Sequence, residues 1–174
     1  MRYTGIGSRD ITKDEFSTLI KVGTILANNG YILRSGKAAG SDTAFQLGMQ
    51  QSLNQQAEIY LPWVKFRSNA DGLQDTWDIC NLHSKCFELA ALIHPAWHRC
   101  SQPVKCLHAR NTQQILGLNL DSPSKFVVYC SNESGGTATA VSLAKAYQIP
   151  TINIRHSNWN VRLYEVLKCL ESSS

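Results

Sequence analysis

The chain has 174 residues, of which 43% are hydrophobic and 17% are charged, and its formal net charge is +4 at pH 7. This composition excludes a disordered protein, and the charge suits an anionic ligand but is too small for a dedicated nucleic-acid binder. A chain of this length buries a full core, so we expect one domain over residues 1–174. No run approaches the about 18 apolar residues of a membrane span, and no secretion signal is visible. We therefore expect a cytoplasmic protein without a membrane partner.

Strand-like and helix-like segments alternate along the first part of the chain. Residues 2–7, Arg-Tyr-Thr-Gly-Ile-Gly, are predicted to form a short strand that ends in glycines. Thr12 and Glu15 have the spacing of a capping box and precede apolar residues at helical spacing, which predicts a helix ending near residues 28–30. A strand over 31–34, a helix from 41 to about 53 and a strand over 57–61 are expected to follow.

The pattern is weaker between Pro62 and Pro103, where we expect a helix from about 73 to 93 that is interrupted. Trp63, Trp77 and Trp97 stand there in a polar setting and either close over a core or stack on bases or sugars. The last elements that we expect are a helix over 104–118, a strand over 125–129, a helix to 147, a strand over 150–154 and a helix over 161–170. The alternation predicts an α/β fold, a Rossmann-like parallel sheet with helices on both faces.

Two loops carry glycines at the point where a strand gives way to a helix, residues 35–42 and residues 134–139. Glycine lets a ligand approach the backbone closely, and the start of a helix offers free N–H groups to a phosphate. A tight turn without a ligand is the alternative. Together with the turn after the first strand, these loops should meet at the carboxyl edge of the sheet, where such folds bind ligands. We therefore predict a pocket for a phosphate-bearing ligand.

Each loop has an expected role in that pocket. Gly36, Gly40 and the N–H groups around Asp42 would hold one phosphate, unless Asp42 is only the N-cap of its helix. The second loop would hold another phosphate or a ribose edge, Arg110 would add a bidentate cation, and Trp63 or Trp97 would cover a base. A valine in place of Gly36 or Gly136 should abolish binding in a folded protein. The candidate ligand-binding residues are Gly7, Ser8, Arg9, Ser35, Gly36, Lys37, Gly40, Ser41, Asp42, Arg110, Asn111, Ser134, Gly135, Gly136, Thr137 and Thr139.

Cysteine and histidine gather in residues 80–108. Cys80, His83 and Cys86 are close in sequence, and a second group follows with His94, His98, Cys100 and Cys106. The spacings lack the paired CxxC knuckles of structural zinc sites, and packing in a core explains a shared helix face equally well. We therefore interpret the cysteines as reduced thiols and expect neither a metal nor a cofactor.

Four motifs, in matching order, resemble DNA-processing protein A. Residues 5–9 resemble its G-[ST]-R turn, and residues 35–42 resemble its S-G-x-A-x-G-x-D loop. Residues 110–118 resemble its Arg-Asn helix, and residues 134–140 stand where that family has a Ser- and Gly-rich loop ending in T-A. The chain thus resembles the SLOG superfamily over residues 3–154. That superfamily also holds LONELY GUY-type hydrolases and sensor domains for nucleotide-derived signals such as cyclic ADP-ribose isomers.

The resemblance implies the fold and a nucleotide-type pocket. LONELY GUY-type enzymes carry a P-G-G-x-G-T-x-x-E loop and use its glutamate to cleave the N-glycosidic bond of a nucleoside monophosphate. Aligned on residues 134–139, that loop places Ser142 where the glutamate belongs. We therefore expect a non-catalytic or weakly catalytic binder. If the chain does cleave its ligand, Glu133 or Asp42 would have to substitute for the missing acid.

The resemblance implies three functions. We favour binding of a nucleotide or nucleotide-derived signal by a stand-alone, phage-encoded domain that sequesters it, as some phage counter-defence proteins do. The first alternative is N-glycosidic hydrolysis. The second is single-stranded DNA binding in recombination, with Trp63 and Trp97 as stacking platforms. The basic residues that would line such a DNA groove are Arg9, Arg34, Lys37, Arg67, Arg99, Lys105 and Arg110. Because SLOG folds usually form dimers, we also expect a homo-oligomer.

Overall fold

The computed structural model describes residues 1–66, 72–132 and 134–172. Within these residues the strands form one six-stranded, all-parallel sheet in the order β4-β3-β2-β1-β5-β6. The strands are β1 (Arg2–Gly7), β2 (Ile32–Ser35), β3 (Ala57–Tyr60), β4 (Asp78–Ile79), β5 (Val127–Cys130) and β6 (Thr151–Asn153). The chain first builds the sheet outward from β1 to β4, then crosses back to place β5 on the other side of β1. The carboxyl ends of β1 and β5 are therefore the topological switch point.

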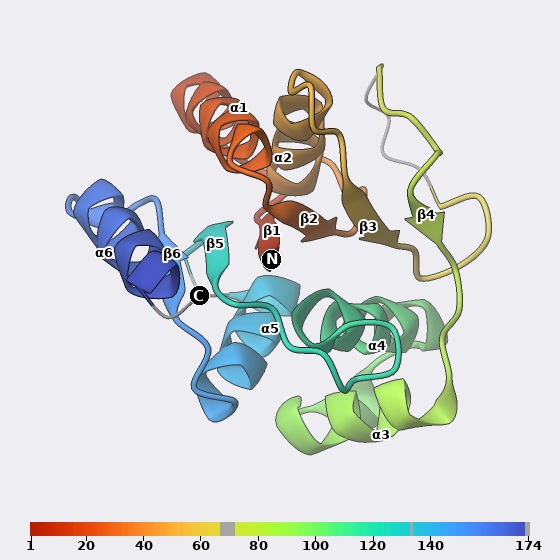
Figure 1. The fold of residues 1–174 in the computed structure, drawn as a ribbon. Coiled ribbons are helices and arrows are strands. Elements are labelled where there is room, and N and C mark those ends of the chain that lie inside the picture. The colour runs from red at the N-terminus through yellow and green to blue at the C-terminus, as the bar shows by residue number, and fades with distance from the viewer. Residues whose placement is uncertain (67–71, 133, 173–174) are drawn as a thin grey trace.

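Helices cover both faces of the sheet, as Figure 1 shows. One face carries α1 (Lys13–Asn28), α2 (Ser41–Gln50) and α6 (Trp159–Ser172), which pack into one hydrophobic cluster with the strands. The other carries α3 (Ser84–Ile93), α4 (Gln102–Leu116) and α5 (Gly135–Ala146), and the 3₁₀ turn η1 (Trp97–Arg99) joins α3 to α4. The predicted Rossmann-like α/β fold is confirmed. No helix among the described residues has both the length and the apolar character needed to cross a bilayer.

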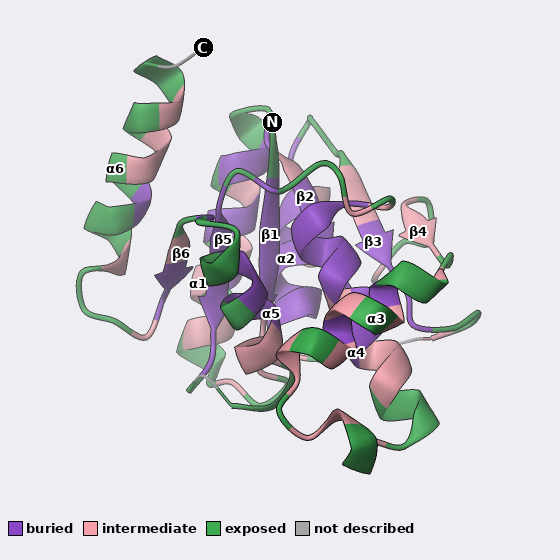
Figure 2. Cartoon of the chain, turned by 90° about the horizontal axis from the view of Figure 1, so that it is seen from below, coloured by how far each residue is buried: buried purple, intermediate pink, exposed green. Residues whose placement is uncertain are grey.

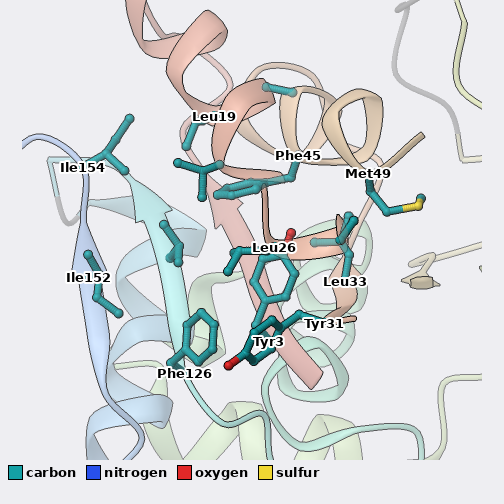
Figure 3. Close-up of a cluster of buried hydrophobic side chains, with 14 of the residues drawn as sticks. Tyr3, Leu19, Leu26, Tyr31, Leu33, Phe45, Met49, Phe126, Ile152 and Ile154 are labelled. Atoms are coloured by element: carbon teal, nitrogen blue, oxygen red, sulfur yellow. The ribbon is translucent and has the colours of Figure 1, made fainter. Parts of the chain in front are cut away.

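The larger cluster is built around aromatic rings of the central strands (Figure 3). The ring of Tyr3 in β1 stacks on Phe126 at a centroid distance of 5.6 Å and meets Phe45 of α2 edge-on at 6.2 Å. In Figure 2 the central strands are buried along most of their length, whereas α6 is largely exposed and buries only Leu163. This layered core fixes the strand ends on which the site is built.

The helix α1 begins as its capping box predicts. The Thr12 backbone N–H donates to Glu15 Oε2 at 2.8 Å, and the Glu15 N–H donates back to Thr12 Oγ1 at 3.1 Å. Its apolar face then buries Leu19 and Leu26 against the sheet. Local signals alone therefore placed this helix correctly.

The prediction of a helix from about 73 to 93 is wrong for the first half of that range. Only Ser84–Ile93 is helical, and Asp78–Ile79 form β4 instead. Backbone N–H groups of Ile59 and Leu61 donate to the carbonyl oxygens of Trp77 and Ile79 at 2.9 and 2.8 Å. Residues 78–79 thus form a strand because they pair with the edge of β3. This pairing is non-local, so the helical periodicity of the sequence does not reveal it.

Candidate functional site

Three loops meet at the carboxyl ends of β1, β2 and β5. The Ser8 backbone N–H donates to the Cys130 carbonyl at 2.7 Å, and the Ser8 carbonyl accepts from the Ser41 N–H and Oγ at 3.0 and 2.9 Å. Gly7 is required between them, because a Cβ there would lie 2.5 Å from the Cys130 oxygen. The predicted convergence of the loops is confirmed.

The first glycine loop, residues 35–42, is packed against protein. Gly40 has φ +76°, and a Cβ there would lie 2.5 Å from the Ser8 carbonyl oxygen. The N–H groups of Ser41 and Thr43 at the start of α2 already donate to the carbonyl oxygens of Ser8 and Ala38, and both residues are buried. Gly40 is the N-cap, so the alternative role of Asp42 as N-cap is wrong. This helix start does not present those two N–H groups to a ligand.

Gly36 faces a side chain of this protein. A Cβ on Gly36 would overlap the guanidinium of Arg110, which comes from α4 on the opposite face of the sheet from α2. The guanidinium Nη1 lies 3.6 Å from Asp42 Oδ2 and 3.5 Å from the Tyr60 carbonyl oxygen. With its amide oriented to satisfy both ends, Gln114 accepts from the Gly36 N–H at 2.9 Å and from Arg110 Nη1 at 3.3 Å. The expected phosphate position above Gly36 is thus filled by Arg110.

The Arg110–Asp42 pair is almost fully buried, with each residue only 4% exposed. Burial raises the pKa of Asp42 above its ordinary value, and the nearby guanidinium of Arg110 opposes that rise. Burial also lowers the pKa of Arg110. Among the described residues, Arg110 Nε has no hydrogen-bond partner although it is buried. A buried cation with an unused donor is costly unless something anionic or polar completes it.

The second glycine loop presents an open helix start. Ser134 is the N-cap of α5 but makes no capping hydrogen bond with its side chain, and Ser134, Gly135 and Gly136 are exposed. Gly135 has φ +62°, and a Cβ built on it would find no atom of the described residues within 4 Å. Asn111 of α4 donates from Nδ2 to the Gly136 carbonyl at 3.2 Å, which fixes the loop beside α4. The first N–H groups of a helix have no partner within it and carry a partial positive charge, and in the described part of the chain this end of α5 is exposed.

Two adjoining cavities lie over these loops. The first, about 490 Å³, is lined by Ser8, Arg9, Asp10, Arg110, Asn111 and the start of α5, among other residues. The second, about 520 Å³, is lined by Asn132 and Arg155, which do not border the first, among other residues. Ser8, Asp10 and Ser134 border both. We call the two cavities together the switch-point groove. Ser8, Arg9, Arg110, Asn111, Ser134, Gly135, Gly136 and Thr137 are the sequence-predicted residues that border it.

Other predicted residues point elsewhere. The Lys37 ammonium lies 2.5 Å from Asp75 and 2.6 Å from Asp78, so it is bound towards β4 rather than towards the groove. Arg34 is 1% exposed and paired with Glu58 at 2.6 Å. Ser35 donates to the Gly5 carbonyl within the sheet at 2.7 Å.

The remaining predicted residues either border no part of the groove or lie outside the described residues. Trp63 packs edge-on against Phe66, and Trp77 packs against the core. Trp97 lies beside His94, and Thr139 is half-buried in α5 without bordering the groove. Arg67 and Glu133 lie outside the described residues.

The groove also contains residues that the sequence did not single out for binding. Asp10 borders both cavities, and its position directly after the Gly-Ser-Arg turn was the available signal. His108 also borders the first cavity, where burial, with His94 and Arg110 nearby, lowers the pKa of its imidazole to about 4. Arg155 borders the second cavity and makes a bidentate pair with Glu15, at 2.6 and 3.2 Å. These residues come from separate segments, so only the fold gathers them.

No family model matches this sequence, and no curated protein is similar to it in sequence. Solved structures share its fold, among them the following two. The Moco carrier protein of Chlamydomonas rheinhardtii is 16% identical with a TM-score of 0.54, and the match covers 97% of this chain and 84% of that one. DNA processing protein A from Helicobacter pylori, a single-stranded DNA binder, is 19% identical with a TM-score of 0.55, and the match covers 97% and 72%. At these identities the likeness shows the fold alone, and it agrees with the α/β fold expected from the sequence.

Proposed function

We propose that this chain binds an anionic, nucleotide-type ligand in the switch-point groove. The observation that carries the proposal is the pairing of an open helix start with a buried cation in one cavity. The exposed, uncapped N-terminus of α5 faces the same 490 Å³ space that Arg110 borders. Both features favour negative charge, and an anion would satisfy donors that the described protein atoms leave unused.

The remaining groove residues suit the rest of a nucleotide. Asp10 adds a carboxylate, which accepts hydrogen bonds from sugar hydroxyls but repels phosphate. The phosphate would therefore lie towards Gly135 and Arg110, and the ribose towards Asp10. Val104 and Leu107 of α4 supply apolar wall on which a base can rest.

The two structures of similar fold are consistent with this class of ligand, because one is a Moco carrier and the other binds single-stranded DNA. We further propose that the ligand is a signalling nucleotide that the protein sequesters without cleaving it. We also propose that the protein forms a homodimer. Light scattering after size-exclusion chromatography measures its oligomeric state directly.

The ligand can be identified without prior assumption. Mass spectrometry of the small molecules released from the purified protein by mild denaturation should show a phosphate-bearing nucleotide. Calorimetric titrations with nucleoside mono-, di- and triphosphates and with cyclic ADP-ribose isomers then rank the classes. If no phosphorylated compound is released and none of the panel binds, the proposal fails.

Single-stranded DNA binding is the second candidate, because one observation favours it. Lys105 Nζ lies 5.5 Å from the centre of the Trp97 ring, a cation–aromatic pair of the kind that contacts backbone and base, and Arg9 and Arg99 are exposed. Against it, Arg34, Lys37 and Arg110 are buried, so three of the seven basic residues expected in a DNA groove do not lie on the surface. A DNA binder loses affinity steeply with salt, whereas a one-nucleotide pocket loses little. Gel shifts at two salt concentrations separate the two candidates.

A further inference from the structure

A second cluster of reactive side chains lies beside the groove. His94 follows α3, Cys100 follows η1, and His108 lies within α4. One ligand atom from each of the three lies within 4.8 Å of the corresponding atoms of the other two. The rings of His94 and His108 are 4.3 Å apart, centre to centre, and Cys100 Sγ lies 3.9 Å from both ring nitrogens of His94.

The protein leaves one of these donors without a partner. His108 is only 5% exposed, and its Nδ1 has no hydrogen-bond partner among the described residues. A buried polar nitrogen without a partner is costly, and a bound ion at this position would remove that cost. The contacts of the other two residues are weak: Cys100 Sγ lies 3.6 Å from the Ala96 carbonyl, and His94 Nδ1 accepts from the Ala96 N–H at 3.2 Å.

The donor set and its spacing fit zinc. Two imidazole nitrogens and one thiolate are ligands that Zn²⁺ prefers, and three protein ligands leave a fourth position for water. Tetrahedral bonds of about 2.0 Å to nitrogen and about 2.3 Å to sulfur place the ligand atoms about 3.3–3.6 Å apart. The 3.9 Å between Cys100 Sγ and the His94 nitrogens needs a small contraction, and the widest separation in the cluster, at most 4.8 Å, needs a larger one. Because Cys100 and His94 lie outside the regular helices, side-chain rotation can supply it.

We propose that His94, Cys100 and His108 bind one Zn²⁺ ion beside the switch-point groove. On binding, the Cys100 thiol loses its proton to solvent, and the metal displaces the Ala96 N–H from His94 if it takes Nδ1. His108 borders the groove, so the ion lies next to the proposed nucleotide site but does not depend on it. Sequence spacing alone predicted no metal, because His108 lies eight residues beyond Cys100 on a different element.

Cobalt(II) tests the site directly. Titration of chelator-treated, full-length protein with Co²⁺ should give one equivalent of binding, tetrahedral absorption bands and a thiolate-to-cobalt charge-transfer band. Cys100→Ala should remove the charge-transfer band, and His94→Ala should weaken affinity at least about tenfold. Cys106→Ala is the matched control, because Cys106 is a free cysteine of α4, close to Cys100 in sequence, but is not part of the cluster. This variant should keep the charge-transfer band.

Zinc competition against a colorimetric chelator should give the same ranking of variants. Circular dichroism checks that each variant is folded. If the wild-type protein shows no charge-transfer band, or if the band survives Cys100→Ala, the proposal is overturned. Nucleotide binding by the metal-free protein is measured separately, so failure of the zinc site and failure of the proposed function are distinguishable.

Discussion

The guanidinium of Arg110 occupies the space that a side chain at position 36 would fill. Gly36 lies at the end of β2, and Arg110 comes from α4, 74 positions later in the sequence. The glycine is therefore explained by an internal contact, since its missing side chain lets Arg110 reach Asp42 and the Tyr60 carbonyl. The sequence of this glycine-rich loop resembles a phosphate-binding loop, but in the structure the loop packs against the buried guanidinium of Arg110.

Gly36→Ala should destabilise the protein by about 2–3 kcal/mol, because the new methyl group displaces Arg110 from its partner. In the Arg110→Ala background the same change should cost less than about 1 kcal/mol, since the clash with the guanidinium is gone and the other close atom, Gln114 Nε2 at 2.5 Å, ends a flexible side chain. Urea unfolding of the four proteins of this double-mutant cycle measures the coupling. Gly136→Ala is the control, because Gly136 like Gly36 does not have a positive φ, and the nearest described atom to its Cβ position is 3.4 Å away. Equal costs in both backgrounds would contradict this packing relationship.

Arg110→Ala should weaken binding of the tightest nucleoside phosphate by about 1.5–3 kcal/mol, the usual size for a hydrogen bond to a charged group. Arg110→Lys should recover only part of this loss, because an ammonium cannot reproduce the guanidinium fork. Calorimetry on folded variants measures both. Arg9→Ala, which removes an exposed cation at the same cavity, is the comparison. A larger loss for Arg9→Ala than for Arg110→Ala would place the anion outside the buried part of the groove.

Thr137→Glu should stabilise the protein while weakening anion binding. Thr137 is the third residue of α5 after the N-cap Ser134, so a glutamate there completes a Ser-x-x-Glu capping box. We expect about 0.5–1 kcal/mol of stabilisation from the helix start. The same carboxylate would repel a bound phosphate and reduce affinity about tenfold, or 1.4 kcal/mol. Ser142→Glu adds the same charge at an exposed position on α5 that borders neither cavity, and it should leave affinity unchanged.

The Glu15–Arg155 pair should make stability depend on pH in the acid range. Its hydrogen bond to Arg155 holds the pKa of Glu15 at about 2, below the ordinary 4.5. Because the folded-state pKa is depressed, the stabilisation is complete above pH 4.5 and is lost as pH falls towards 2. Both side chains are partly exposed, so solvent screening limits the contribution to about 1 kcal/mol.

Glu15→Gln isolates this pair, because glutamine preserves the capping box with Thr12. The stability difference between wild type and Glu15→Gln, measured by urea unfolding, should be near 1 kcal/mol at pH 6 and should shrink as the pH approaches 2. A difference that stays constant across this range would show that the ion pair is not its source.

We expect no release of free base from nucleoside monophosphates. The resemblance to LONELY GUY-type hydrolases aligns Ser142 with their glutamate, and Ser142 is exposed on α5 and borders neither cavity. Chromatography of reactions with each common monophosphate tests this. Base release that disappears in Asp10→Asn or in Glu133→Gln would identify a carboxylate that replaces the missing glutamate, and the hydrolytic function would then be correct.

The sequence by itself determined the parts of this protein that depend on neighbouring residues. Thr12 and Glu15 are three positions apart, so their capping box could be read directly and α1 begins where it predicts. The alternation of strands and helices gave the parallel sheet, and glycines at strand ends located the loops that meet at the switch point. Such signals act within a few residues, where chain connectivity fixes the geometry.

Only the tertiary structure decided which side chains border the switch-point groove. Lys37 and Gly36 are adjacent, yet one pairs with Asp75 and Asp78 and the other is covered by Arg110. These contacts depend on the order of the strands and on how helices cross the sheet, and many arrangements satisfy the same local pattern. The contact between the rings of His94 and His108 likewise depends on the tertiary structure, because the two rings come together only when α4 packs along α3.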